Sequence, residues 1–330
     1  MILIVFVLWT VWSWHAVTEK ITLDLPEEIN EGVRIVLVTD LHSCFYGKGQ
    51  KNLISMIDAQ NPDIIILGGD IFDDKIADDN AKFLLEDLVT KYPCYYVTGN
   101  HEYWSGRVPE MKEYLESIGV SVLEGECETV GINGNMIDVC GIDDPTDMFR
   151  SDWEDQLQAA YEASSEDHIR LLVTHRPEEA YEYAKYDFDL IMAGHAHAGQ
   201  IRIPFVNKGV FAPNQGYMAE YVSGTYELSN GSTMVVSRGL ARESTPAPRY
   251  KLVKYSLNSG HLILLISLNN ALRKSPEEVQ LYLDHLTIIS SLVSLLYRIT
   301  LNVLSNRFIN LSTLSAVYPV STAACFTLNS

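Results

Sequence analysis

The chain has 330 residues, of which 47% are hydrophobic and 20% are charged. This composition is typical of a globular protein and excludes an intrinsically disordered one. The formal net charge of −19 argues against a nucleic-acid partner, because proteins that bind nucleic acid usually carry a basic surface. We therefore expect a folded protein with an acidic surface.

The first 17 residues, MILIVFVLWTVWSWHAV, form an apolar run. Its length is at the lower limit for a transmembrane helix, and Trp9, Trp12 and Trp14 lie toward one end, where interfacial aromatics are common. No basic segment precedes the run and no small-residue cleavage site follows it. We predict that residues 1–17 anchor the chain in the cell membrane, with the folded domain on the outer face. A buried N-terminal strand or helix is the alternative.

Five apolar runs between residues 33 and 250 are short, and each ends abruptly in a polar or glycine-bearing turn. Such runs are typical of strands that are buried on both faces. Residues 51–61 and 80–92 have apolar residues at helical spacing. Strands and helices in alternation predict an α/β layer architecture. The five predicted strands lie in 33–40, 62–70, 94–100, 169–175 and 189–195.

The rest of the chain is less regular. Between residues 103 and 146 we expect a helix followed by β structure at 119–125 and 135–144. A further helix is predicted to start at Ser275, because proline and two glutamates follow it. We divide the chain into the anchor at 1–17, a folded domain at 18–250, and a C-terminal tail at 251–330. The tail has no assigned role; we expect it to be partly helical, and its helix either contacts a membrane or a partner or packs on the folded domain.

The five cysteines contain no C-x-x-C pair, and an odd number cannot be paired completely within one chain. A structural zinc site would normally show cysteine ligands in such a pattern, so we predict none. We interpret the cysteines as buried free thiols. They are Cys44, Cys94, Cys127, Cys140 and Cys325.

The informative feature is the residues that end the five predicted strands. In an open α/β sheet, ligands bind beyond the carboxyl ends of the strands, so these side chains are expected to meet at one edge. Glycine precedes three of them, Asp70, Asn100 and His195, which allows the backbone to turn sharply there. The candidate metal ligands are Asp40, His42, Asp70, Asn100, His175, His195 and His197.

These donors predict a catalytic metal site. Carboxylate, amide oxygen and imidazole, without thiolate, suit Mn, Fe, Zn, Co or Ni. Seven side chains are too many for one ion that keeps an open position. They match two divalent ions that share a bridging carboxylate and hold a substrate between them. The histidines outside the strand ends are interpreted as ordinary surface or core groups.

The five sequence blocks D-x-H, G-G-D, G-N-H, H and G-H-x-H resemble those of the calcineurin-like metallophosphoesterases. The resemblance covers residues 33–249 and implies an αββα sandwich with two central mixed sheets and a dinuclear metal centre at the strand carboxyl ends. It implies that Asp40, His42 and His197 hold one ion, that Asn100, His175 and His195 hold the second, and that Asp70 bridges them.

The blocks GGDIFD, YYVTGNHEYW, GHAHAGQ, APNQGYM and SRGL further resemble the membrane-associated bacterial YkuE-like branch. Some relatives of that branch act on lipid-linked pyrophosphates such as UDP-diacylglucosamine. The segment PRYKLVKYSL departs from the usual ending of the branch, which leaves the last strand of one sheet unassigned from the sequence.

The resemblance implies a hydrolase of phosphate esters or anhydrides that uses a metal-bridging hydroxide, with a lipid-linked or nucleotide phosphate as substrate. His101 falls on the histidine that assists the leaving group. Asp73 and Glu102 are candidates to orient the ligands through hydrogen bonds. The alternatives are a catalytically silent metal-binding scaffold, a protein phosphatase and a cyclic-nucleotide phosphodiesterase. A nuclease is less favoured because of the charge, and we infer no protein partner.

Overall fold

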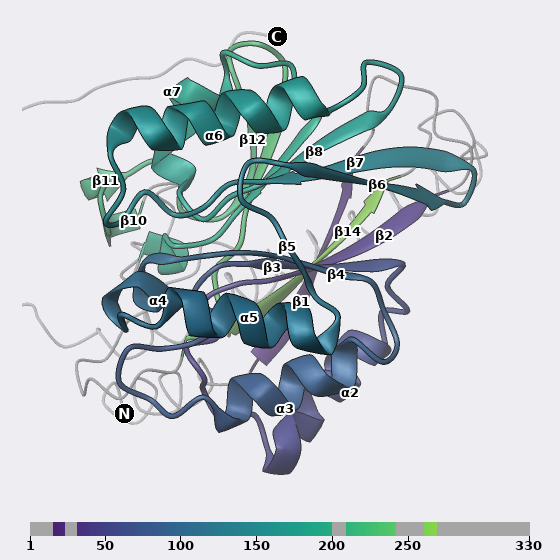
Figure 1. Cartoon of the computed structure of the whole chain (residues 1–330), viewed down its shortest axis with the longest axis vertical. Helices are drawn as coiled ribbons and strands as arrows, with labels where there is room; N and C mark the ends of the chain where they lie inside the picture. The colour runs from purple at the N-terminus through teal and green to yellow at the C-terminus, as the bar shows by residue number, and fades with distance from the viewer. Residues whose placement is uncertain (1–15, 24–31, 200–208, 242–260, 269–330) are drawn as a thin grey trace, which may run out of the picture. The chain divides into compact units, whose positions relative to one another are not determined.

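Two mixed sheets of six strands each lie at the centre of the protein (Figure 1). The structure is a computed structural model that describes residues 16–23, 32–199, 209–241 and 261–268. The first sheet has the order β1-β14-β2-β3-β4-β5. Strands β2 to β5 run parallel, and β14 is antiparallel to β2 but parallel to β1. The bounds are β1 Ala16–Leu23, β2 Val33–Val38, β3 Ile64–Gly68, β4 Cys94–Val97, β5 Ser121–Val122 and β14 His261–Leu268.

The second sheet has the order β12-β13-β9-β8-β7-β6. Its four inner strands run parallel, and the edge strands β6 and β12 are antiparallel to their neighbours. A separate hairpin of β10 and β11 follows β9 in the sequence. The bounds are β6 Cys127–Ile132, β7 Asn135–Gly141, β8 Ile169–Val173, β9 Leu190–Ala193, β10 Gly209–Ala212, β11 Gly216–Ala219, β12 Gly224–Glu227 and β13 Thr233–Val236.

Alternate side chains of the buried strands serve two different cores. In β2, Ile35 and Leu37 pack between the two sheets, against residues such as Leu171 of the second sheet. Val36 and Val38 of the same strand point the other way, into the core beneath the helices. Since both faces of these strands are covered, their sequences are apolar throughout rather than alternating.

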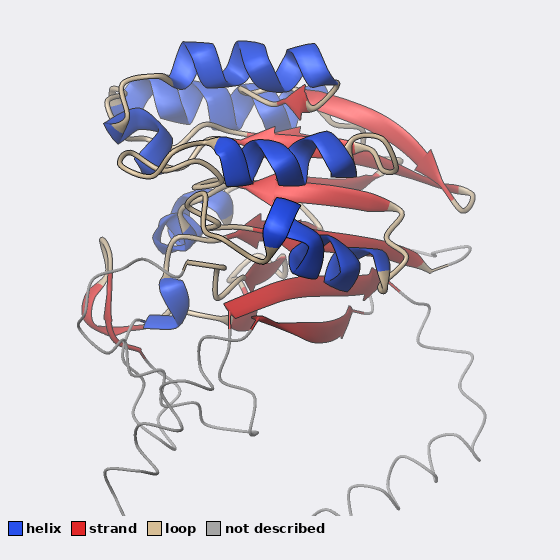
Figure 2. Ribbon diagram, turned by 90° about the horizontal axis from the view of Figure 1, so that it is seen from below, coloured by secondary structure: helices blue, strands red, loops and turns tan. Residues whose placement is uncertain are grey.

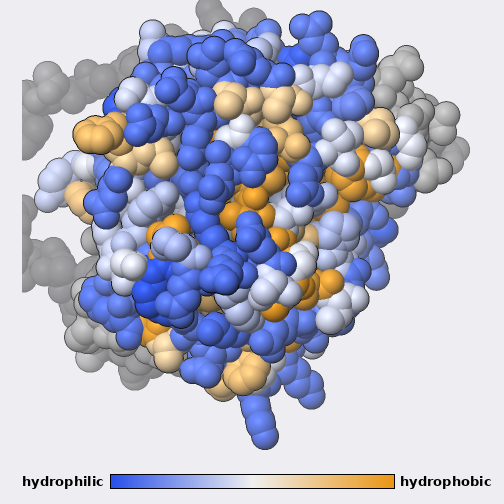
Figure 3. Space-filling model, in the orientation of Figure 1, coloured by the Kyte–Doolittle hydropathy of each residue, from blue (hydrophilic) through white to orange (hydrophobic). Residues whose placement is uncertain are grey.

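Helices cover the outer face of each sheet, which completes an αββα sandwich (Figure 2). Helices α2, α3 and α5 pack on the first sheet, and α6 and α7 pack on the second. The face in Figure 3 is mostly hydrophilic, with small apolar patches between polar residues. The bounds are η1 Lys48–Gln50, α2 Lys51–Asp58, α3 Asp79–Leu88, α4 Asn100–Trp104, α5 Val108–Ile118, α6 Arg150–Ala163, η2 Pro177–Glu179, α7 Ala180–Tyr183 and η3 His197–Gly199.

The predicted fold class is confirmed. The five predicted strands correspond to β2, β3, β4, β8 and β9, and the helices predicted at 51–61 and 80–92 correspond to α2 and α3. Helix α6 and strand β6 were not predicted. Strand β14 falls within the predicted tail, yet it pairs with β2 in the first sheet. Residues 1–15, which make up most of the predicted anchor, and the predicted helix after Ser275 lie outside the described residues. Within the described part of the chain, no helix is both long and apolar enough to cross a membrane.

The interpretation of the cysteines was wrong for one pair. Cys127 and Cys140 face each other on the antiparallel strands β6 and β7 and form a disulfide. Sequence spacing could not show this, because the pairing depends on the register of the two strands. Cys44 and Cys94 are buried free thiols, as predicted, and burial raises the pKa of Cys94 to about 12. Cys325 lies outside the described residues.

Candidate metal centre

Five strands deliver the candidate ligands to one edge of the sandwich. Strands β2, β3 and β4 of the first sheet are followed by Asp40 and His42, by Asp70, and by Asn100 respectively, while β8 and β9 of the second sheet are followed by the histidines. All seven side chains are buried, the most exposed at only 8%. Six of the predicted ligands fall into two groups that share Asp70, and Asn100 lies next to Gly99, whose backbone approaches the Asp70 carboxylate.

Most of these residues have an uncommon backbone conformation. Few non-glycine residues have a positive φ, and such conformations cost roughly 1–3 kcal/mol each and gather at functional sites. Here the strained residues come from different loops, and their side chains converge. A metal ion bound by all of them would require this arrangement. The φ angles are 52° at Asp40, 48° at His42, 53° at Asp70, 62° at His195 and 44° at His197.

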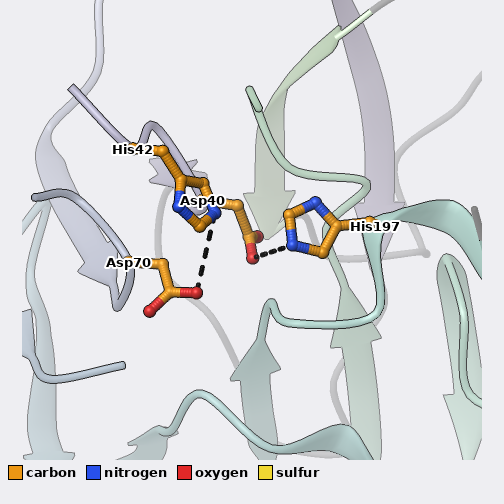
Figure 4. A group of neighbouring side chains, drawn as sticks. All are labelled: Asp40, His42, Asp70 and His197. Atoms are coloured by element: carbon orange, nitrogen blue, oxygen red, sulfur yellow. Dashed lines mark ion pairs between the residues drawn. The ribbon is translucent and has the colours of Figure 1, made fainter. Parts of the chain in front are cut away.

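One group of possible ligands consists of Asp40, His42, Asp70 and His197 (Figure 4). One ligand atom from each residue lies within 4.8 Å of the others. His42 Nε2 lies 3.6 Å from Asp70 Oδ2, and His197 Nε2 lies 3.5 Å from Asp40 Oδ1. The four side chains point toward a common centre in the figure, as the ligands of one cation would.

A second group consists of Asp70, His175 and His195, so Asp70 belongs to both. His175 Nδ1 lies 2.9 Å from the carbonyl oxygen of Gly68 and donates to it. This hydrogen bond leaves Nε2 as the ligand atom, 3.2 Å from Asp70 Oδ2. A carboxylate shared by two groups of donors is the arrangement expected for a bridge between two ions.

The donor atoms fit divalent cations. Within the described residues, the following buried atoms have no hydrogen-bond partner: Asp40 Oδ2, Asp70 Oδ2, Asn100 Oδ1, His175 Nε2 and His195 Nδ1. A buried polar atom left without a partner costs about 1–3 kcal/mol, so five such atoms in one place call for a common ligand. Because all are oxygen or nitrogen, they suit the first-row divalent metals.

The Oδ1 atoms of Asp40 and Asp70 accept hydrogen bonds from the backbone of neighbouring loops. Asp40 Oδ1 accepts a hydrogen bond of 3.0 Å from the backbone N–H of His195, and Asp70 Oδ1 accepts one of 2.8 Å from that of His101. Asp70 thus keeps Oδ1 for the protein and has Oδ2 beside His42 and His175, whereas Asp40 Oδ1 also faces Nε2 of His197. The same residues that are candidate metal ligands therefore also join the strand ends of the two sheets through hydrogen bonds.

Glu102 holds the backbone around Asp70. Its carboxylate accepts hydrogen bonds from the N–H groups of Asp70, Phe72 and Gly99 at 2.9–3.0 Å. Burial, together with the nearby Asp70, raises the pKa of Glu102 to about 7. Glu102 is fully buried and touches backbone rather than a ligand side chain, so it acts on the shape of the two loops.

Asp73 contacts two histidines. Its Oδ2 lies 3.3 Å from Nδ1 of His42 and 3.3 Å from Nδ1 of His101. Burial alone would raise the pKa of Asp73, but hydrogen bonds from His101 and His42 outweigh it and lower the pKa. Because Asp73 binds Nδ1 of His42, the ring presents Nε2 to the first group of donors.

His101 lies at the edge of the centre. Its ring packs edge-on against His42, with 4.2 Å between the ring centroids, and its side chain is 15% exposed. Asp74, which no sequence pattern marks, has Oδ1 only 2.8 Å from Nδ1 of His101. His101 is thus partly accessible to solvent beside the candidate ligands, and two carboxylates face its Nδ1.

The charge around the donors is strongly negative. Burial favours neutral His175, but the carboxylates of Asp70 and Asp40 outweigh burial and raise its pKa to about 10. Burial also raises the pKa of Asp40, whereas the histidines around Asp70 overcome burial and hold its pKa well below the usual range. A divalent cation would supply the positive charge that these carboxylates attract.

Two further residues contact the centre and were missed. Arg176 follows His175 and binds Asp144 with two nitrogens; its Nη1 also lies 2.9 Å from Nε2 of His195. Asn214, in the β10–β11 hairpin, places Oδ1 3.0 Å from the same Nε2. No strand-end pattern marks either one, and only the tertiary structure brings the hairpin to the centre.

Comparisons with known proteins agree with this geometry. The model of the family "Calcineurin-like phosphoesterase" matches residues 33–199. A metallophosphoesterase of Helicobacter pylori (strain ATCC 700392 / 26695) is 27% identical over 64% of the chain and 55% of its own length. A Bos taurus protein, "Transmembrane protein with metallophosphoesterase domain", is 29% identical over 67% of the chain and 51% of its own length. The metallophosphoesterase YkuE of Bacillus subtilis is 28% identical over 66% and 74%. The aligned part spans about half the length of the first two relatives.

Proposed function

The chain belongs to the calcineurin-like phosphoesterase family, and on this basis we propose that it hydrolyses phosphate esters or anhydrides with two divalent metal ions. The resemblance to the branch that includes YkuE supports the same class of reaction. Family membership alone does not make a chain an enzyme, since a silent scaffold can keep the fold. The proposal therefore depends on the centre itself.

The proposal depends on one observation: among the described residues, buried oxygen and nitrogen atoms of the candidate metal ligands have no hydrogen-bond partner. We assign Asp40, His42 and His197 to one ion and Asn100, His175 and His195 to the other, with Asp70 between them. All seven predicted ligands are present and buried. A scaffold that binds no metal would have no need to keep such strained and unsatisfied groups.

The bound ions would activate a water molecule and neutralise charge on the phosphate. We assign the protonation of the leaving oxygen to His101, which lies beside the donors and is partly exposed. Asp73 and Asp74 hold Nδ1 of His101, which leaves Nε2 as the nitrogen that would donate the proton. Asp73 also orients His42, and Glu102 fixes the loops that carry Asp70 and Asn100.

We further propose a lipid-linked or nucleotide phosphate as the substrate and the membrane as the location. The apolar residues 1–17 support an anchor, and the bovine relative is named as a transmembrane protein. The disulfide between Cys127 and Cys140 supports the outer face, because disulfides persist in oxidising compartments. Thiol labelling in intact cells would test the location: an outer-face domain keeps this pair oxidised, and a reduced pair would refute it.

The function is tested with the full-length chain in detergent and a panel of substrates. These are p-nitrophenyl phosphate, bis(p-nitrophenyl) phosphate and a lipid-linked pyrophosphate, each with Mn, Zn or Fe. We expect metal-dependent turnover that is abolished by a chelator and restored by metal. Protein that binds both ions yet hydrolyses none of the three would support the scaffold instead. Preference for the lipid substrate would support the membrane proposal.

A further inference from the structure

His195 has two ring nitrogens in different surroundings. Within the described residues, Nδ1 is buried and has no hydrogen-bond partner, and His195 forms a group of possible metal ligands with Asp70 and His175. Nε2 has two hydrogen-bond partners, Asn214 Oδ1 at 3.0 Å and Arg176 Nη1 at 2.9 Å, and Glu178 Oε1 lies 3.9 Å from it. Which nitrogen carries the proton decides whether His195 can bind a metal ion.

The two hydrogen-bond partners of Nε2 favour opposite tautomers. An amide oxygen only accepts, so Asn214 Oδ1 is satisfied when Nε2 carries the proton and Nδ1 keeps its lone pair. A guanidinium only donates, so Arg176 favours a proton on Nδ1, where no acceptor is found among the described residues. Arg176 has other partners, because its Nε and Nη2 bind the carboxylate of Asp144.

The hairpin that carries Asn214 is built to hold it in place. Asn214 has a φ of 58°, a conformation that asparagine tolerates better than most residues. The side chain of the next residue, Gln215, bonds the backbone of Glu220 and Tyr221. Ala212 and Ala219, on the two strands, are buried in the core beneath. The position of Asn214 is therefore fixed from both sides of the turn.

We propose that Asn214 is a positioning residue: its side-chain oxygen holds His195 in the tautomer that presents Nδ1 to a metal ion, against the competing donor Arg176. The inference rests on the proposed function, because it assumes that His195 ligates an ion. It adds a residue from the β10–β11 hairpin to a centre that the sequence assigned to strand ends alone. It also predicts that the ion beside His195 depends on this hairpin, whereas the ion beside His42 does not.

The test compares variants of the full-length chain in detergent. Asn214→Gly removes the side chain and tolerates the positive φ, and Asn214→Asp keeps an acceptor oxygen at the same place. Tyr217→Ala is the matched control, because Tyr217 is an exposed side chain of the same hairpin. Mn²⁺ and Zn²⁺ affinities are measured by competition with a chromophoric chelator, and thermal unfolding checks the fold.

We expect Asn214→Gly to weaken one of two binding steps by about 10–100-fold, the usual effect of removing a group that orients a ligand. Asn214→Asp should restore the affinity, and Tyr217→Ala should leave both steps unchanged. Unchanged binding in Asn214→Gly, equal loss of both ions, or failure of Asn214→Asp to restore binding would each overturn the inference. Wild-type protein that binds no metal would refute the proposed function instead, so the two failures are distinguishable.

Discussion

At the scale of single residues, the backbone of two glycines passes so close to the candidate metal ligands that no larger residue fits there. A Cβ atom on Gly69 would lie 2.5 Å from Nδ1 of His175, and one on Gly99 would overlap the carboxylate of Asp70. The glycines that precede Asp70 and Asn100 in the sequence are thus required by space and not only by turn geometry. Larger residues there would push the proposed bridge away from its partners.

We predict that Gly99→Ala lowers kcat/KM by at least about tenfold, because the displacement of reacting groups by 1 Å can cost a hundredfold. Metal content should fall with it, since Asp70 is shared by both groups of donors. Gly131→Ala is the matched control, because its nearest side-chain atom would be 3.6 Å away. Gly99→Ala protein with normal rates and metal content would show that the loop has room to move.

His101→Ala is predicted to lower kcat by about 10²–10⁴-fold while both ions stay bound, as expected for loss of a general acid. Steady-state kinetics and metal analysis of the same preparation measure this. His168→Ala is the control, because His168 bonds Asp138 and lies just before β8, at the opposite end of that strand from His175. If kcat falls only in proportion to the metal that is lost, His101 helps to hold the metal ligands in place and is not the general acid.

Residue types at the strand ends were sufficient to select the seven candidate ligands, because each chemistry-bearing side chain follows an apolar run. Local pattern could not select Asp74, Arg176 or Asn214. Asp74 follows Asp73 with no feature that distinguishes the two, and their different contacts with His101 depend on the loop. Arg176 and Asn214 meet at His195 only through the tertiary structure.

At the scale of elements, the strands buried on both faces and the helices α2 and α3 were predictable, whereas α6, β6 and β1 were not. Helix α6 buries only Trp153, Leu157 and Ala160 among its 14 residues, so its apolar signal is weak. Strand β6 is an edge strand with mostly exposed or half-buried side chains, CETVGI. Strand β1 includes the polar run Thr-Glu-Lys next to the predicted anchor, which hides it.

The disulfide joins the edge strand β6 to β7, and we predict that it stabilises the fold. Cys127→Ala combined with Cys140→Ala should lower the free energy of unfolding by about 2–3 kcal/mol, the usual value for a loop of this size. Denaturant unfolding with and without a reducing agent measures it. Reductant should shift the wild-type midpoint and leave the double variant unchanged. An equal response of both proteins would contradict the pairing.

Asp78 at the start of α3 and Arg107 before α5 form a paired contact of 2.7 and 2.9 Å. The hydrogen bond from Arg107 lowers the pKa of Asp78 in the folded protein. The pair should therefore stabilise the fold above about pH 4 and lose this effect as the pH falls below the unfolded pKa of aspartate. Asp78→Asn should cost less than about 1 kcal/mol at pH 7, since the pair is partly exposed. Urea unfolding should show this difference shrinking between pH 4 and pH 2; a constant difference would refute it.

At the scale of the molecule, the centre exists because two sheets meet. Asp40, Asp70 and Asn100 come from the first sheet, and the histidines at 175, 195 and 197 come from the second. Hydrogen bonds such as His195 N–H to Asp40 Oδ1 join the two sheets at that edge. The family resemblance predicted this sandwich, while the paired cysteines and the strand from residues 261–268 required the structure.

The most direct test is an anomalous diffraction experiment on crystals of the full-length protein grown with Mn²⁺. The account predicts two peaks about 3.5–4 Å apart, the spacing of two-metal sites. One should lie among Asp40, His42 and His197, the other among Asn100, His175 and His195, with Asp70 in contact with both. No peak at this edge of the sandwich, or a single peak that Asp70 does not touch, would contradict it.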